Sequence, residues 1–175
     1  MTIAPDSHRP VPVLTTEQAT LLKLRAAGRS RARIARALYT SESQITDLLN
    51  QLQAALGAES RAQLIGLGLI HRIVSPQDVI VRHVSVPIPL TPRQRQVLTI
   101  FATGGNDQDA ATALGITTST VREYASKLLS NLGARDRAHA VGLGLVYEVL
   151  LLSDLNPALP AVTLTDHLAQ FAANT

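Results

Sequence analysis

The chain contains two copies of one sequence unit, and this repeat constrains its fold more than any other feature. Residues 14–74 align with residues 90–150 at an offset of 76 positions without a gap, and 20 of the 61 aligned pairs are identical. An ungapped self-match of this kind indicates a duplicated supersecondary unit. We therefore predict the following segments: an N-terminal arm, 1–13; a first unit, 14–74; a linker, 75–89; a second unit, 90–150; and a C-terminal tail, 151–175.

Helix start and stop signals divide each copy into four helices. The first helix begins with the capping-box spacing Thr15-x-x-Gln18 or Thr91-x-x-Gln94 and runs to Gly28 or Gly104. Short polar residues and glycines mark the later boundaries. The predicted N-caps are Ser30 and Asn106 for the second helices, Ser41 and Thr117 for the third, and Ser60 and Asp136 for the fourth, while Gly57 and Gly133 end the third helices. The fourth helices are expected to run to about Val74 and Leu150. The fold class is all-α.

The segments outside the repeats carry weaker signals. Residues 75–89 are rich in β-branched residues and end in two prolines, which favours an extended connector or a short strand over a helix. The tail is punctuated by prolines, and only the stretch from Asp166 to Ala173 reads as a short helix.

Residues 108–132 of the second copy read as two helices joined by a tight turn. Gly115 suits the left-handed conformation that ends a helix, and Thr117 suits the N-cap of the next one. One face of that next helix is apolar, and the opposite face is polar or charged. The apolar face comprises Val121, Ala125, Leu128 and Leu132, and the polar face comprises Thr118, Ser119, Thr120, Arg122, Glu123, Ser126 and Lys127. Such a polar face is typical of a helix that reads the major groove of DNA.

These motifs resemble the LuxR-type (GerE-like) helix-turn-helix DNA-binding domain. The resemblance covers residues 90–150 and is carried by Leu90-Thr91-Pro92, Ala111-x-Ala113-Leu114-Gly115-Ile116, Thr120-Val121-Arg122 and Leu132-Gly133-Ala134-Arg135-x-Arg137-Ala138. It implies that the third helix enters the major groove and that the fourth commonly mediates dimerisation. It also implies groove-facing positions for Thr120, Val121 and Arg122, with Lys127 and neighbouring polar groups near phosphates. The candidate DNA-binding residues of this copy are Thr118, Ser119, Thr120, Val121, Arg122, Ser126 and Lys127.

The first copy departs further from this pattern. Thr46 stands at the position of Arg122, Leu48 replaces Tyr124, and Tyr39 replaces the turn glycine. The first copy is also more basic, with eight Lys or Arg against four Asp or Glu, compared with six against five in the second. We therefore predict that the first copy contacts mainly phosphates and the second reads bases. The candidate contacts of the first copy are Arg29, Arg31, Arg33, Gln44 and Thr46. The alternative is that these arginines form an ordinary solvated face.

Each predicted fourth helix contains two glycines, which cost about 1 kcal/mol apiece relative to alanine. We interpret them as sites of close approach to another helix, either the fourth helix of the other copy or that of a second chain. The predicted interface residues are Gly66, Gly68, Leu69, Gly142, Gly144 and Leu145. Packing against the first helix of the same unit remains the alternative.

Composition excludes several function classes. The formal net charge is +3, cysteine is absent, and aromatics make up 3% of the chain, which leaves few platforms for stacking single-stranded bases. The five histidines lack metal-ligand spacing, so we expect no catalytic residues, no metal and no cofactor. No apolar run is long enough for a membrane span, and no signal peptide is recognisable at the N-terminus, so we expect a cytoplasmic protein.

The sequence thus predicts a transcriptional regulator that binds double-stranded DNA through tandem helix-turn-helix units. It is expected to act as a homodimer or as an intramolecular pseudo-dimer paired through the fourth helices. The alternative is an adaptor or antagonist that does not bind DNA and pairs with another regulator through that surface.

Overall fold

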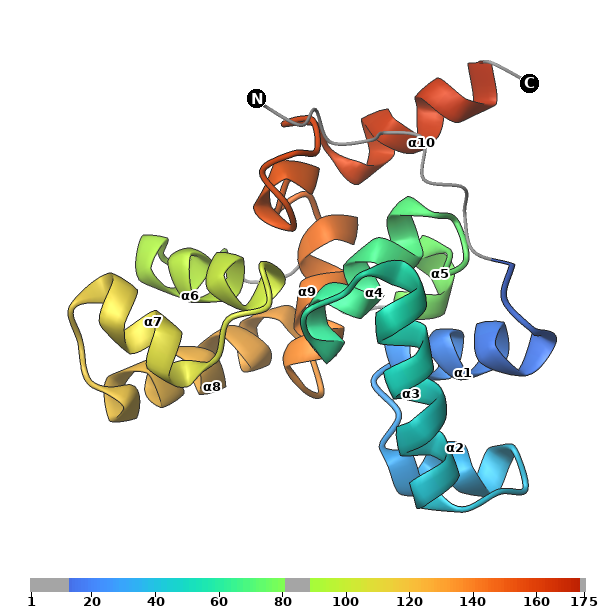
Figure 1. The fold of residues 1–175 in the computed structure, drawn as a ribbon. Helices are drawn as coiled ribbons and strands as arrows, with labels where there is room; N and C mark the ends of the chain where they lie inside the picture. Colours follow the sequence, from blue (N-terminus) through green and yellow to red (C-terminus); the bar gives the residue numbers. More distant parts are fainter. Residues whose placement is uncertain (1–12, 81–88, 174–175) are drawn as a thin grey trace, which may run out of the picture.

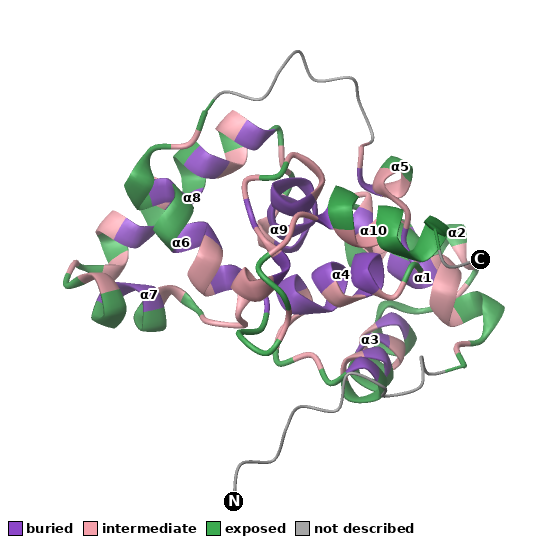
Figure 2. Ribbon diagram, turned by 90° about the horizontal axis from the view of Figure 1, so that it is seen from above, coloured by how far each residue is buried: buried purple, intermediate pink, exposed green. Residues whose placement is uncertain are grey.

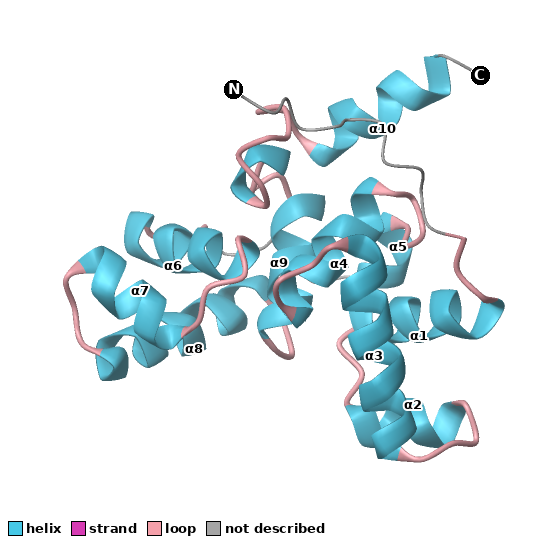
Figure 3. Cartoon of the chain, in the orientation of Figure 1, coloured by secondary structure: helices cyan, strands magenta, loops and turns pink. Residues whose placement is uncertain are grey.

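The computed structural model describes residues 13–80 and 89–173, and within them the chain is helical with no β-strand (Figures 1 and 3). The all-α prediction is therefore confirmed. The helices are α1 (Thr16–Ala26), α2 (Arg31–Ala37), α3 (Glu42–Leu56), α4 (Arg61–Ile70), α5 (Pro76–Val79), α6 (Pro92–Ala102), α7 (Asp107–Leu114), α8 (Thr118–Leu132), α9 (Arg137–Val146) and α10 (Leu164–Ala173), with a 3-10 turn at Leu152–Asp154. Across these described ranges, every helix is too short or too polar to cross a bilayer.

The helix starts lie where the polar caps predict them. Thr15 and Thr91 accept hydrogen bonds from the backbone N–H groups of the Gln residues three positions later. The predicted caps of the second, third and fourth helices also accept such bonds. Gly57 and Gly133 end α3 and α8 in the left-handed conformation, with φ of 67° and 66°. Local capping chemistry therefore accounts for most of the helix boundaries.

The ends of the fourth helices were predicted wrongly. Helices α4 and α9 stop at Ile70 and Val146, four residues before Val74 and Leu150. In each case a non-glycine residue with positive φ reverses the chain, so that Val74 and Leu150 fold back into the core, where they are 1% and 0% exposed. The burial of these two side chains offsets the conformational cost of a positive φ at a residue other than glycine. Because no glycine marks the turn, the sequence gives no local signal for it.

The prediction of an extended linker is wrong at its start. Ser75 begins the one-turn helix α5, donating its hydroxyl to Asp78 Oδ2 at 2.8 Å while its N–H donates to the same atom at 2.9 Å. Val79, at the end of this turn, is fully buried. The rest of the linker, 81–88, and nearly all of the predicted arm lie outside the described residues. The terminal helix is confirmed as α10, which begins at Leu164.

Helices α4 and α9 lie at the centre and pack against each other, with α1–α3 on one side and α6–α8 on the other (Figures 1 and 2). Every residue from Ala62 to Gly66 and from Ala138 to Leu145 is buried. The C-terminal segment covers part of this pair, because α10 packs on both helices and the Leu155 side chain lies against Gly66. The described residues share one hydrophobic core.

The four glycines of α4 and α9 have different neighbours. A Cβ at Gly142 would lie 3.1 Å from Ile65 of α4 and 3.1 Å from Val79 of α5, so this glycine lies at the contact between the two central helices. Gly66 instead faces Leu155. Gly68 faces Leu22 and Val74, and Gly144 faces Leu98 and Leu150, so both lie against the first helix of their own unit. Leu69 and Leu145 are 1% and 0% exposed.

Candidate nucleic-acid interface

Helices α7 and α8 form a helix-turn-helix whose turn is fixed by two residues. Gly115 ends α7 with φ of 64°, and Thr117 caps α8 by accepting from the N–H of Thr120 at 3.2 Å. The hydroxyls of Thr117 and Thr120 also lie 2.9 Å apart, so Thr120 takes part in the cap. The turn sets the direction in which α8 leaves α7.

One side of α8 is inserted into the core. Ala125 is 5% exposed, and Val121, Leu128 and Leu132 are fully buried. Val121 therefore does not face a groove, and that part of the site prediction is wrong. Its place in the apolar i, i+4, i+7 series already assigned it to the core.

The other side of α8 stays open to solvent. Ser119, Arg122, Ser126 and Lys127 are exposed, and Thr118 and Thr120 are half-buried. The main packing partners of α8 are α6, α7 and α9 of its own half, whereas α10 lies at the opposite end of the molecule (Figure 1). In Figure 2 the ribbon of α8 alternates between exposed and buried residues. Among the described residues, none covers the four exposed side chains.

Asp107 in the first turn of α7 positions the basic residue of this face. It lies 3.3 Å from Nε of Arg122 and 2.6 Å from Nη2 of Arg137. The Arg122 side chain remains 71% exposed. The neighbouring Asp109 accepts from the N–H of Asn106 at 2.8 Å as part of the α7 cap. Both carboxylates of this acidic turn therefore have partners within the protein, which weakens their repulsion of a phosphate.

The corresponding face of α3 offers fewer free groups. Gln44 is exposed, but its carbonyl oxygen accepts from the N–H of Ser41 and from the Thr40 hydroxyl. Thr46 donates to the Glu42 carbonyl at 3.0 Å and accepts from Arg31 at 3.3 Å. The Gln44 carbonyl oxygen and the Thr46 hydroxyl are thus occupied by hydrogen bonds within the protein.

The three predicted arginines of the first half lie on the surface beside α3. Arg29, Arg31 and Arg33 are all exposed, on α2 and on the turn that precedes it. Tyr39, in the turn between α2 and α3, is 98% exposed and has φ of 53° at the position where the second half has Gly115. The surface beside α3 therefore combines a strained, exposed turn residue with three exposed guanidinium groups.

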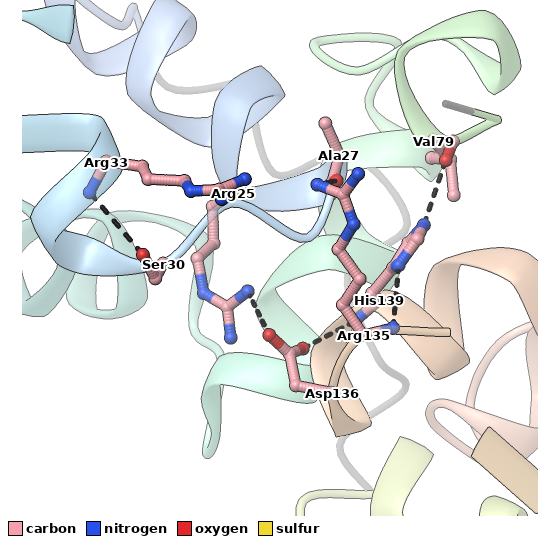
Figure 4. Close-up of polar contacts among 8 residues, drawn as sticks. All are labelled: Arg25, Ala27, Ser30, Arg33, Val79, Arg135, Asp136 and His139. Atoms are coloured by element: carbon pink, nitrogen blue, oxygen red, sulfur yellow. Dashed lines mark hydrogen bonds and ion pairs between the residues drawn. The ribbon is translucent and has the colours of Figure 1, made fainter. Parts of the chain in front are cut away.

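Sequence reasoning missed the polar contacts that join the two halves (Figure 4). Arg25 of α1 forms an ion pair at 2.8 Å with Asp136, the N-cap of α9. Arg135 donates to the Ala27 carbonyl at 3.4 Å. Burial would raise the pKa of Asp136, but the hydrogen bond and charge of Arg25, with the N–H of His139, hold that pKa below its ordinary value. No local sequence pattern predicts these contacts, because the two partners of each are about a hundred positions apart in the sequence.

Gln63 and His139, which are equivalent in the repeat, make equivalent contacts. Gln63 accepts from the N–H of Glu59 at 2.6 Å and donates to the Leu155 carbonyl at 3.0 Å. His139 accepts from the N–H of Arg135 through Nδ1 at 3.1 Å, and its Nε2 lies 2.9 Å from the Val79 carbonyl. Burial lowers the pKa of His139, although the Val79 carbonyl and Asp136 act in the opposite direction. This histidine is a structural tie between α9 and α5.

Comparison with known proteins agrees with this geometry in the second half. Residues 88–143 match the family described as "Bacterial regulatory proteins, luxR family". Those residues form a LuxR-type helix-turn-helix domain. The LuxR-type domain contains all of α6, α7 and α8 and most of α9.

A curated relative matches over a similar length. The chain is 40% identical over 53 residues to the transcriptional regulatory protein DesR of Bacillus subtilis (strain 168), and this match covers 30% of the chain. The chain spans only 27% of the length of DesR. No solved structure matches the chain.

Proposed function

We propose that this protein is a transcriptional regulator that binds double-stranded DNA with sequence preference, using the outer face of α8 to read bases. The observation that carries this proposal is the exposure of Ser119, Arg122, Ser126 and Lys127 in a LuxR-type domain whose opposite face is locked in the core. A helix held this way presents hydrogen-bonding side chains and positive charge to a major groove.

We also propose that residues 14–74 form a second helix-turn-helix unit of the same type. Its support is the correspondence of α1–α4 with α6–α9, whose starts are all offset by 76 positions. Since Gln44 and Thr46 are engaged in internal hydrogen bonds, this unit contributes phosphate contacts through Arg29, Arg31 and Arg33 rather than base reading.

In this proposal a single chain is an internal pseudo-dimer. In LuxR-type domains the fourth helix commonly mediates dimerisation, and here α4 and α9 bury that surface against each other and beneath the C-terminal segment. The two units differ at their outer positions, so the preferred DNA site is asymmetric. Sedimentation should show one chain per duplex.

The test is binding to duplex DNA measured by fluorescence anisotropy over a range of salt concentrations. Arg122→Ala and Lys127→Ala should each weaken binding, and each lost phosphate contact should reduce the salt slope by about 0.9. Arg93→Ala is the matched control, because it removes an exposed arginine of α6 that is not on the α8 face.

Selection of bound sequences from a random duplex pool should then yield one asymmetric motif. Absence of salt-dependent binding to any duplex would reject the DNA-binding proposal and favour the adaptor alternative.

A further inference from the structure

A hollow lies where the two halves meet, and its lining is dominated by arginine. It has a volume of about 300 Å³ and is bounded by α1, α2, α3, the start of α4 and the cap of α9. We call it the arginine hollow. Its lining residues are Arg25, Arg29, Ser30, Arg31, Thr46, Leu49, Arg61 and Asp136.

The charges in the arginine hollow do not balance. Four arginines face one carboxylate, so the lining carries +4 − 1 = +3. Arg25 is committed to Asp136 through the 2.8 Å ion pair. The positive charge of Arg29, Arg31 and Arg61 is therefore left without an acidic partner in the lining.

Arg61 is the most constrained of these groups. Its Nη2 donates to the Asn50 side chain at 2.6 Å, while its Nη1 is buried without a hydrogen-bond partner. Burial lowers the pKa of Arg61, and the charges of Arg25 and Arg31 lower it further. Arg61 is therefore held among like charges with one donor unpaired, and an anion in the hollow would offset this concentration of positive charge.

We propose that the arginine hollow binds a compact polyphosphate group. Guanidinium groups match phosphate oxygens in planar, paired hydrogen bonds, and a net charge of +3 around about 300 Å³ favours a small ligand that carries several negative charges. The phosphates could come from a free phosphorylated small molecule or from the backbone of bound DNA. This site is separate from the outer face of α8, but it shares Arg29 and Arg31 with the phosphate contacts proposed for the first unit and to that extent rests on the proposed function.

The test is titration calorimetry of the full chain with inorganic tripolyphosphate at constant ionic strength and without DNA. One ion should bind per chain, at least tenfold more tightly than sulfate. Arg61→Gln and Arg31→Gln should each weaken this binding at least tenfold. Arg36→Gln should leave it unchanged, because Arg36 is exposed on α2, donates to the Ala32 carbonyl and does not line the hollow.

Thermal unfolding checks that each variant is folded. If Arg61→Gln does not fold, Arg31→Gln still tests the proposal. Absence of saturable binding to the folded wild-type chain, or equal binding by the Arg31 and Arg36 variants, would overturn the proposal.

A competition experiment with duplex DNA distinguishes the two sources of phosphate. If saturating tripolyphosphate displaces duplex DNA at constant ionic strength, the hollow serves the DNA backbone. If both bind together, it serves a free ligand. Arg122→Ala should lose DNA affinity and retain tripolyphosphate, so failure of base reading and failure of the anion site are distinguishable.

Discussion

The ion pair between Arg25 and Asp136 links the two halves, and its removal should lower the free energy of unfolding in two separable parts. Asp136 caps α9 by accepting from the N–H of His139 at 3.0 Å, and loss of such a cap costs about 1 kcal/mol. Asp136→Ala also leaves the guanidinium of Arg25, whose side chain is 15% exposed, without its partner, at about 1–2 kcal/mol. Because the Asp136 side chain is 38% exposed, solvent screening favours the lower values.

Urea denaturation can resolve these parts. Asp136→Ala should cost about 2 kcal/mol, whereas Asp136→Asn should cost about 1 kcal/mol, because asparagine still caps the helix but carries no charge. A double-mutant cycle with Arg25→Ala should give a coupling of about 1 kcal/mol. Thr117→Ala, which removes the cap of α8, should show no coupling to Arg25. Zero coupling between Arg25 and Asp136 would refute this account of the junction.

Three further stability measurements test other features. Gly142→Leu should cost about 1–3 kcal/mol in urea denaturation, because a Cβ there already lies 3.1 Å from Ile65; an unchanged stability would contradict the close packing of α4 and α9. Tyr39→Gly should raise the melting temperature, since it relieves a positive φ worth about 1 kcal/mol at a side chain that is 98% exposed; a lower melting temperature would show an unrecognised contact. The free energy of unfolding should fall as pH drops below about 6.5, because burial holds the pKa of His139 beneath its unfolded value and the unfolded chain then binds more protons. His139→Gln should reduce this dependence, as Gln63 fills the equivalent position, and an identical pH profile would disprove that assignment.

Local sequence signals predicted most of the helices because their boundaries depend on nearby atoms. Thr15, Ser41 and Thr117 each cap a helix by bonding to a backbone N–H three residues later, and such bonds are visible in the spacing alone. Val121 shows the limit of transferring a motif, since the apolar periodicity of α8 placed it correctly in the core while the family resemblance placed it in the groove.

Features set by distant contacts could not be predicted. Helix α5 depends on the burial of Val79 against α9, and the ends of α4 and α9 depend on the burial of Val74 and Leu150. The Arg25–Asp136 pair joins the first copy to the second, and Asp136 completes the lining of an arginine hollow whose other residues come from the first copy. In each case the partner is brought near by the packing of α4 on α9.

The most direct test of the central proposal is site-specific crosslinking of α8 to DNA. The chain has no cysteine, so single cysteines can be introduced and labelled with a photoreactive group. With a selected duplex bound, the group on Ser119→Cys should crosslink to DNA, whereas the group on Ala172→Cys, exposed on α10 at the opposite end, should not. Bound DNA that crosslinks to position 172 and not to position 119 would contradict recognition through the outer face of α8.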